Sequence, residues 1–564
     1  MKILPWSRIA SHENLLRLTF LGILAAYLPT VNFDFVYDDV PGIMLNPWLR
    51  SWSGLWLAFS QHSSAFVEGA VVTPARHYRP LYLLWLWLVA NVFGYAPGWF
   101  HLWAVFLHIM ATYLSYRLAK ALLRDDLGAA IAALVFGLHP TKVETVSWIA
   151  AAAESLMAVF FFSACLAYLR AREDAGKRRA WLFVLFLSSL AAFLTKETAV
   201  VLPALIIAFE LLVAPARKAR LPLRTLLKLS SPVWAALLLF LAIRFRILHG
   251  VGDQAAAAPL RVNLFTAPTA FWLYLRQLVW PVHLSEFYPI TVVAHFSVRQ
   301  VVLPALAIAL LASLYWLWAR RSPVLQLAAV WYAVTLAPVI AEFSWVQLHD
   351  RHLYLPSFAV ALMVAVAFRQ FKWPGQSRPE TAQAIAAASL GIVMTLISVR
   401  EAQVWNSDLT AFTRAVEVAP ANTEAVDLLA TAFRNNGSSD KAEATWLRGL
   451  EHSPASPRLN LALGSYYYEI HNYDRAALYL RRALKASPRI PGALFELGII
   501  EWQRGDSSCA GHHLAAAVAL RPTNEGYRRA LAQITAVRGE ESAGGEGNLS
   551  LKARSAPDAE CSAE

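Results

Sequence analysis

The chain has 564 residues, of which 57% are apolar and 16% are charged. Soluble globular domains rarely reach this apolar content, so the composition excludes an entirely soluble enzyme. Lys and Arg number 50 against 38 Asp and Glu, a net charge of +12. In a membrane protein such a surplus collects in cytoplasmic loops, and it does not indicate nucleic-acid binding.

Apolar runs of roughly 17 to 25 residues, long enough to cross a bilayer as a helix, follow one another up to about residue 400. We predict eleven spans, near residues 14–32, 98–118, 128–146, 151–170, 180–195, 198–214, 232–248, 298–318, 324–341, 353–371 and 383–400. Two shorter stretches, 81–93 and 267–282, are rich in Trp and Tyr, which is typical of interfacial helices. Residues 1–400 are therefore predicted to form an all-α membrane bundle.

Clusters of Lys and Arg set the orientation, because short basic loops stay on the cytoplasmic side. These clusters lie at residues 2–8, 117–124, 170–179, 217–228, 320–321 and 369–378. Every second loop is then cytoplasmic, and everything after residue 400 lies outside. The outer loops are 31–81, 139–150, 195–198, 249–297 and 341–352. The Ala-, Leu- and Arg-rich composition favours a bacterial inner membrane, with the second half of the chain in the periplasm.

The second half is a repeat. Pro420, Pro454, Pro488 and Pro522 are each separated by 34 residues, which is the tetratricopeptide period. We predict a tetratricopeptide-repeat α-solenoid over residues 401–537, with three full repeats and capping helices that bury the end faces. Residues 538–564 are rich in Gly, Ser, Glu and Ala, and predict a disordered tail.

Two adjacent carboxylates, Asp38 and Asp39, follow the first span. An acid at the bilayer edge can take a proton from an attacking hydroxyl, and partial burial raises its pKa usefully. Neighbouring side chains in an extended loop point apart, so we expect at most one of the two to act as a base. The alternative is that one of them caps the interfacial helix that begins near Pro47, or ends the first span.

The second outer loop contains His139 and Glu144, and Glu154 stands at the start of the next apolar run. A carboxylate that enters a membrane segment is costly, which favours a functional role. Glu144 has an alternative role as an ion-pair partner of Lys142. No further ligands accompany His139 at metal spacing, so we predict no metal site there.

Cations also occur on the predicted outer side. Lys196 and Glu197 form a short turn between two spans, and either pair with each other or place Lys196 on a phosphate. Arg276 and Arg351 oppose the positive-inside trend. A lipid phosphate explains them, and so does an ion pair with the outer acids.

Several strings occur together in the order and spacing of a known family. They are Tyr37-Asp38-Asp39 with Asn46-Pro47, Tyr78-Arg79-Pro80-Leu81, Phe100-His101-Leu102 with His108, His139-Pro140 with Glu144, Lys196-Glu197-Thr198, Trp280-Pro281, and Leu353-Tyr354-Leu355-Pro356-Ser357 after Arg351. With the repeats, residues 14–537 resemble the transmembrane and tetratricopeptide repeat-containing O-mannosyltransferase-like proteins of the GT-C glycosyltransferase superfamily.

The resemblance implies transfer of mannose or a similar hexose, with inversion, from a polyprenyl-phosphate carrier to a protein hydroxyl or another envelope acceptor on the outer face. The residues that it implicates are Asp38 or Asp39 as the base, Glu144 and Glu154 as second acids, Arg79, Lys196, Arg276 and Arg351 as donor-phosphate contacts, and Tyr37, His139, Glu197, His352 and Tyr354 as further site candidates. A divalent cation such as Mg or Mn is an option in this superfamily, although the sequence shows no preorganised cage.

This chain departs from the family pattern at Ala153, where an Arg is frequent, and at Asp350-Arg351-His352. Because of these departures, the resemblance is weaker evidence for the identity of the sugar donor and acceptor than for the fold. Besides the bilayer and the lipid-linked sugar, the expected partner is a protein or peptide held by the repeats. One alternative is a non-enzymatic scaffold in envelope or polysaccharide assembly. A transporter ranks last, because its ionisable groups usually lie near the bilayer midplane.

Overall fold

The computed structural model describes residues 11–63, 65, 77–248, 259–290, 292–341, 348–371 and 379–543. Every regular element in these ranges is a helix, which confirms the all-α prediction. The chain divides into two compact units, and in the described ranges the first runs up to Arg414 and the second begins at Ala415. Four residues of the predicted basic clusters, Lys2, Arg8, Lys372 and Arg378, lie outside the described residues.

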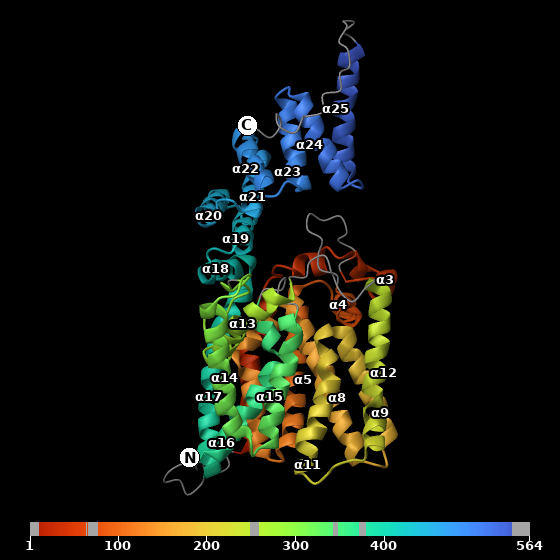
Figure 1. The fold of residues 1–564 in the computed structure, drawn as a ribbon, viewed down its shortest axis with the longest axis vertical. Helices are drawn as coiled ribbons and strands as arrows, with labels where there is room; N and C mark the ends of the chain where they lie inside the picture. Colours follow the sequence, from red (N-terminus) through yellow and green to blue (C-terminus); the bar gives the residue numbers. More distant parts are fainter. Residues whose placement is uncertain are drawn as a thin grey trace. The chain divides into compact units, whose positions relative to one another are not determined.

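The first unit is a bundle of long helices (Figure 1). They are α2 (His12–Tyr27), α5 (Pro97–Leu123), α6 (Asp126–Leu138), α8 (Ala153–Glu173), α9 (Arg178–Thr195), α10 (Leu202–Ala208), α12 (Leu223–Leu248), α14 (Leu303–Ala319), α15 (Pro323–Ala341), α16 (Pro356–Gln370) and α17 (Pro379–Ala402). In the described ranges, eight helical stretches are long and apolar enough to cross a membrane. The other three predicted spans overlap α5, α6 and α16, although α6 ends at Leu138, before the predicted end of its span at residue 146. Each predicted span thus contains a helix, while the number of crossings stays a prediction.

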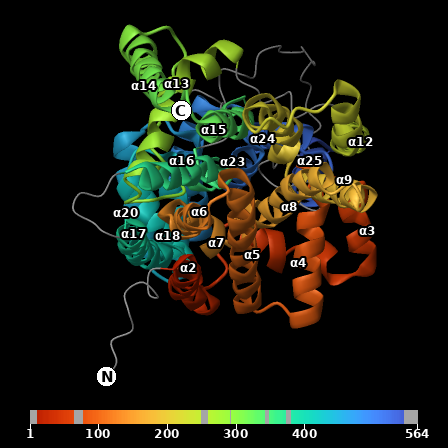
Figure 2. The ribbon, with the colours of Figure 1, turned by 90° about the horizontal axis from the view of Figure 1, so that it is seen from below.

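Helix α6 forms the centre of this bundle, between α2, α5, α16 and α17 (Figure 2). Every residue from Leu127 to Leu138 is buried. Small residues let the neighbouring helices approach closely. A Cβ on Gly137 would come within 2.7 Å of Thr112, and one on Gly391 of α17 within 2.9 Å of Leu134. The tightly packed central helix thus fixes the starting position of the segment that follows it, residues 139–152.

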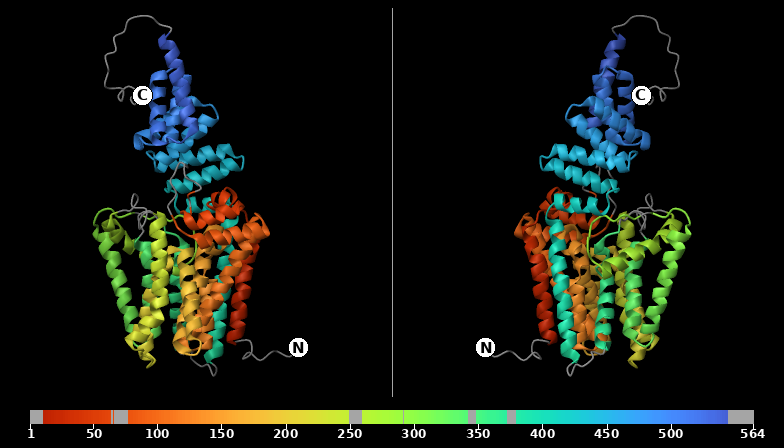
Figure 3. Two further views of the ribbon diagram at one scale, coloured as in Figure 1. Left: turned by 90° about the vertical axis from the view of Figure 1, so that its right-hand side faces the viewer. Right: turned by 90° about the vertical axis from the view of Figure 1, so that its left-hand side faces the viewer.

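Basic residues gather at one end of the bundle. There, Arg217 donates to the backbone carbonyl of Ala121 at the end of α5 (3.2 Å), and Arg369 pairs with Asp125 just before α6 (2.5 Å). The short helices α3 (Trp52–Ser60) and α4 (Pro80–Phe93) lie at the opposite end, where the red and orange segments gather in Figure 3. Helix α7 (Val143–Ser147) follows the end of α6. The basic loops and the predicted site loops are therefore on opposite ends, as the alternation of loops predicts.

The two predicted interfacial stretches are helices. Helix α4 matches its prediction closely, whereas α13 spans Leu260–Val279 and so begins and ends earlier than the predicted 267–282. Its end has a local cause, because Pro281 disfavours the helical conformation at Trp280. Trp280 is the C-cap of α13 in a non-helical conformation (φ −134°, ψ 73°).

The second unit consists of helical hairpins. Its helices are α19 (Thr423–Asn435), α20 (Ser439–His452), α21 (Pro457–Glu469), α22 (Tyr473–Ala486), α23 (Pro491–Gln503), α24 (Ser507–Leu520) and α25 (Glu525–Ala543). Each predicted repeat contains one antiparallel pair, and Pro stands at the first position of α21 and α23, where its missing N–H costs no hydrogen bond. Helix α25 continues to Ala543, past the predicted start of the tail, and residues 544–564 lie outside the described residues. Helix α18 (Asp408–Val418) joins the two units.

Replacing Gly464 by Val is expected to destabilise the repeat unit by about 1–3 kcal/mol, because added volume overpacks a close contact. A Cβ at this position would lie 2.9 Å from Leu480 Cγ and 3.1 Å from the Leu480 backbone nitrogen. Gly492, in the first turn of α23, has open space around it and provides the matched control. Thermal unfolding of the full chain in detergent should show a lower transition for Gly464→Val and no loss for Gly492→Ala, and equal transitions would contradict this packing.

Candidate active site

The site is built around the segment between α6 and α8, which contains η5 (Pro140–Lys142), α7 and η6 (Ile149–Ala152). His139 begins it as a buried cap, since its Nδ1 accepts from the backbone N–H of Thr141 (3.3 Å). Its Nε2 lies 3.0 Å from the carbonyl oxygen of Leu278. Both ring nitrogens are therefore used within the fold, which fits a structural role for this predicted site candidate.

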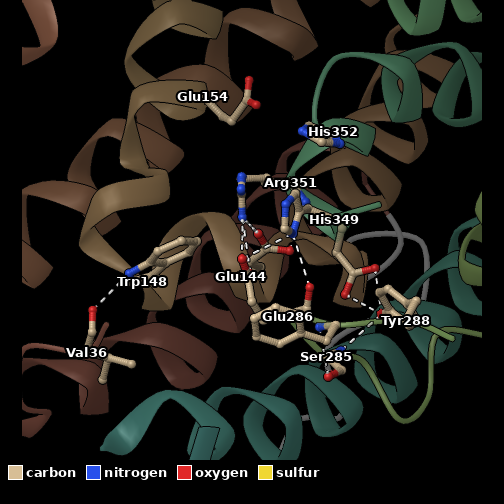
Figure 4. Close-up of polar contacts among 12 residues, drawn as sticks. Val36, Glu144, Trp148, Glu154, Ser285, Glu286, Tyr288, His349, Arg351 and His352 are labelled. Carbon is tan, nitrogen blue, oxygen red and sulfur yellow. Dashed lines mark hydrogen bonds and ion pairs between the residues drawn. The ribbon is translucent and has the colours of Figure 1, made fainter. Parts of the chain in front are cut away.

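Glu144 and Arg351 form the central ion pair. Glu144 is 2% exposed, pairs with the Arg351 guanidinium, and accepts the Arg351 backbone N–H at 3.1 Å. Burial raises the pKa of Glu144, although the Arg351 charge opposes this shift. Arg351 Nη1 also lies 3.2 Å from Glu286 Oε2, so one guanidinium bridges two carboxylates (Figure 4).

Lys142, the alternative partner considered for Glu144, points into the core. Its Nζ donates to the backbone oxygen of Tyr354 (3.1 Å) and to the Ser357 hydroxyl, and lies 4.5 Å from the centre of the Tyr354 ring. Tyr354 is fully buried and hydrogen-bonds His108 through its hydroxyl (2.8 Å). Lys142 thus ties the turn after Arg351 to the turn before Glu144, and Tyr354 supports the site from within the bundle.

A second group of polar residues surrounds the ion pair, and sequence reasoning did not assign it roles. His349 Nδ1 lies 3.2 Å from Glu286 Oε1, and the Tyr288 hydroxyl donates to Asp350, 2.8 Å from its Oδ2. Burial and the charge of Glu144 raise the pKa of Asp350 well above its usual value. The only signal in the sequence was the presence of acids in the outer loop 249–297 and beside Arg351, without a motif to connect them.

In the described part of the chain, Glu144, Glu286 and His349 are the one group whose ligand atoms come together as for a metal ion, all within 4.8 Å of one another. The donor set does not fit a resident divalent cation. The Arg351 guanidinium already hydrogen-bonds both carboxylates and compensates their charge, so a metal would have to displace it. Mg or Mn could bind these three residues only if Arg351 moved away from both carboxylates.

The first outer loop is fixed to the same segment by Asp39. This carboxylate is 1% exposed, and it accepts the backbone N–H of Ala150 at 2.7 Å and that of Val36 at 3.1 Å. Burial raises the pKa of Asp39 well above its usual value, while these hydrogen bonds oppose the shift. Asp38, in contrast, is exposed. The two adjacent carboxylates therefore have different environments.

Trp148 connects this loop to the ion pair. Its Nε1 donates to the carbonyl oxygen of Val36 (3.1 Å), and the Arg351 guanidinium lies 4.9 Å from the centre of its ring. The Tyr37 ring packs beside Trp148 at 5.8 Å, with a left-handed backbone (φ 56°) at Tyr37. Trp405 stacks on Trp148 with ring centres 5.2 Å apart. Asp39, Glu144 and Arg351, from three distant loops, thus belong to one connected network.

The predicted phosphate contacts are ion-paired. Lys196 Nζ lies 2.5 Å from Glu154 Oε1, and Arg79 binds Glu197 through two bonds of 3.0 and 2.5 Å. The alternative of a salt bridge at Lys196 is thus present, but with Glu154 in place of Glu197.

His352 lies near these cations. The charges of Arg351, Lys196 and Arg79 all act on its ring, and burial with these charges lowers its pKa well below the usual value. Arg276 is exposed, and no ion pair of its side chain is formed with a described residue. The fold therefore brings Arg79, Lys196 and Arg351 to one end of the bundle without joining Arg276 to their network.

Comparisons with known proteins agree with this architecture. A tetratricopeptide repeat family model matches residues 461–525, which confirms the predicted repeats. Protein O-mannosyl-transferase F38B6.6 of Caenorhabditis elegans is 25% identical over 470 residues, covering 78% of this chain and 63% of that protein. Protein O-mannosyl-transferase TMTC2 of Homo sapiens is 29% identical over 238 residues, 40% of this chain and 27% of the relative. The chain thus spans less than two thirds of these curated relatives.

Among solved structures, ArnT from Cupriavidus metallidurans, crystallised bound to undecaprenyl phosphate, aligns over 90% of this chain and 79% of its own. The sequence identity is 15% and the TM-score is 0.34. The likeness is too distant to transfer residues.

Proposed function

We propose that the chain is a membrane glycosyltransferase that transfers mannose or a similar hexose from a polyprenyl-phosphate donor to a protein hydroxyl on the outer face of the membrane. The similarity to proteins named O-mannosyl-transferases supports the reaction class. The observation that carries the proposal is the network joining Asp39, Glu144 and Arg351 at the end of the bundle away from the basic loops. Acids and cations meet there, as transfer from a phosphate-linked sugar requires.

Asp38 is the group we assign as the general base. It is exposed and so accessible to an acceptor, whereas Asp39 is buried and holds the backbone N–H groups of Val36 and Ala150. The charges of Asp38 and Arg79 both act on the hydroxyl of Tyr82, which supports a position of Asp38 near the cation pairs. Asp39 positions the loop that presents Asp38.

The proposed reaction is a single displacement. The acceptor oxygen attacks the anomeric carbon of the sugar, its proton passes to Asp38, and the bond between this carbon and the phosphate oxygen breaks with its electron pair on the phosphate. A lipid phosphate is a good leaving group, so no general acid is required. Lys196 and Arg79 stabilise the developing negative charge, and Glu144 and Arg351 orient the sugar and acceptor.

The test is transfer by the purified protein in lipid nanodiscs, with polyprenyl-phosphate mannose and a Ser/Thr-containing peptide, followed by mass spectrometry. We expect a peptide carrying one hexose, formed from the lipid-linked donor and not from a nucleotide sugar, with inverted anomeric configuration by NMR. No transfer from any polyprenyl-phosphate hexose would overturn the proposal and leave the scaffold as the better explanation.

The proposed sidedness gives a separate expectation. Alkaline phosphatase fused after Ala543, the end of α25, should be active in intact bacterial cells, because an odd number of crossings with an inner N-terminus puts the repeats outside. β-Galactosidase at the same position should be inactive, since it folds only in the cytoplasm. The reverse pattern would contradict the predicted count of eleven crossings.

A further inference from the structure

Arg244 is a half-buried cation that the reaction described above does not use. It lies in α12, where a charge in a membrane-spanning helix is costly and indicates a function. Its Nη1 is buried and makes no hydrogen bond with any residue that the structure describes. In contrast, Arg79 and Arg351 at the same end of the bundle are each held by carboxylates.

The fold places Arg244 beside the phosphate contacts. Helix α12 packs along α9, and α9 ends directly before Lys196 (Figures 1 and 2). Arg244 lies close enough for its charge to act on His77, together with the charges of Arg79 and Lys196. His77 in turn lies with its Nδ1 3.5 Å from Glu197 Oε1.

The charges of three cations, Arg79, Lys196 and Arg244, act on His77. A carboxylate at 3.5 Å would normally raise the pKa of an imidazole, yet the charge of Arg79 is the largest influence and the pKa of His77 is lowered to about 3. His77 is therefore neutral at pH 7 and can donate one N–H. Of the three cations, Arg79 pairs with Glu197 and Lys196 pairs with Glu154, whereas Nη1 of Arg244 has no hydrogen-bond partner in the described residues.

We propose that Arg244 and His77, beside the Arg79–Glu197 pair, bind the phosphate of the lipid-linked donor. A guanidinium whose Nη1 makes no hydrogen bond with a described residue, next to a second arginine, matches the several acceptor oxygens and the negative charge of a phosphate. The identity of the ligand as a lipid-linked donor rests on the proposed function, because free phosphate would present the same phosphate group to these residues. It adds a residue of α12 to contacts that otherwise come from α4 and the turn at Lys196.

The test compares Arg244→Gln with Arg246→Gln, a change of an exposed arginine two residues further along the same helix. Binding to the full-length protein in nanodiscs is measured for undecaprenyl phosphate, for undecaprenol and for inorganic phosphate. We expect Arg244→Gln to weaken undecaprenyl-phosphate binding about tenfold or more, the size expected for lost charge-assisted hydrogen bonds. Undecaprenol should bind both variants and the wild type equally, and Arg246→Gln should bind undecaprenyl phosphate as the wild type does.

Arg244→Lys keeps the charge, so this variant should recover most of the undecaprenyl-phosphate affinity that Arg244→Gln loses if that loss is electrostatic. The melting temperatures of all variants are recorded to detect misfolding. Inorganic phosphate that binds the wild type as tightly as the lipid and depends equally on Arg244 would overturn the assignment to the lipid donor. Undecaprenyl-phosphate affinity of Arg244→Gln within twofold of wild type would overturn this site alone. A wild-type protein that binds no undecaprenyl phosphate would overturn the donor class as well.

Discussion

Replacing Asp38 by Asn is expected to lower kcat for sugar transfer by about 100- to 10,000-fold while leaving the melting temperature unchanged, because the change removes a general base from an exposed position. The KM for the lipid-linked donor should change little, since the amide keeps the size of the side chain and the donor cations remain. Steady-state kinetics in nanodiscs, with thermal unfolding of the same samples, provides both values.

Asp39→Asn is the matched variant, and it should behave differently. Its carboxylate accepts two backbone N–H groups, and an amide supplies only one acceptor oxygen for them. One buried N–H of Val36 or Ala150 is then left unpaired, which costs about 1–3 kcal/mol. The melting temperature and the activity should therefore fall together. A stable, inactive Asp39→Asn protein beside an active Asp38→Asn protein would reverse the two assignments.

Arg351→Met is expected to have the largest effect on stability, about 3–5 kcal/mol, because it leaves two buried carboxylates without their common partner. Glu144 is 2% exposed and Glu286 6% exposed. Denaturant unfolding of the detergent-solubilised protein measures the loss. The triple variant that also carries Glu144→Gln and Glu286→Gln serves as the control, since removal of both charges should recover much of the stability.

The loss caused by Arg351→Met should depend on pH. Burial already raises the pKa of Glu144, and removal of the Arg351 charge raises it further. A carboxyl whose folded-state pKa lies above its unfolded value stabilises the fold at low pH, and this contribution is lost as pH rises through the folded pKa. The variant should therefore be closer to wild type at pH 5 than at pH 8. A pH-independent difference would mean that the carboxylates are not the source of the instability.

Much of the fold could be predicted from the sequence, because the length of an apolar run and the spacing of a repeat can be read from neighbouring residues alone. The apolar runs and the 34-residue spacing of Pro420, Pro454, Pro488 and Pro522 each predicted helices that the structure contains. Helix α13 shows the limit, since its first turns precede the Trp- and Tyr-rich run that identified it. Boundaries depend on caps and neighbouring contacts, which hydropathy does not report.

The sequence predicted which charged residues belong to the candidate site better than it predicted which of them form ion pairs with one another. Glu144, Glu154, Lys196 and Arg351 were recognisable as costly charges near a membrane, but their partners come from residues 42 to 207 positions away in the chain. The alternative Lys142–Glu144 ion pair is not formed, because Arg351 pairs with the carboxylate while aromatic rings and a carbonyl oxygen surround the Lys142 amine. Glu286 was missed for the same reason, since only the folded chain brings it to Arg351.

The first residues after α17 contact the proposed site, and this limits where the repeats can be exchanged by protein engineering. Trp405 stacks on Trp148, and Asp408 accepts the backbone N–H of Tyr37 at 2.8 Å, next to the proposed base. A chimera that exchanges the repeat array at residue 400 would remove these contacts and disturb catalysis even if the new repeats fold well. The fusion point should instead follow Arg414, so that every residue up to the end of the first unit comes from this chain. A change in acceptor preference can then be attributed to the exchanged repeats alone.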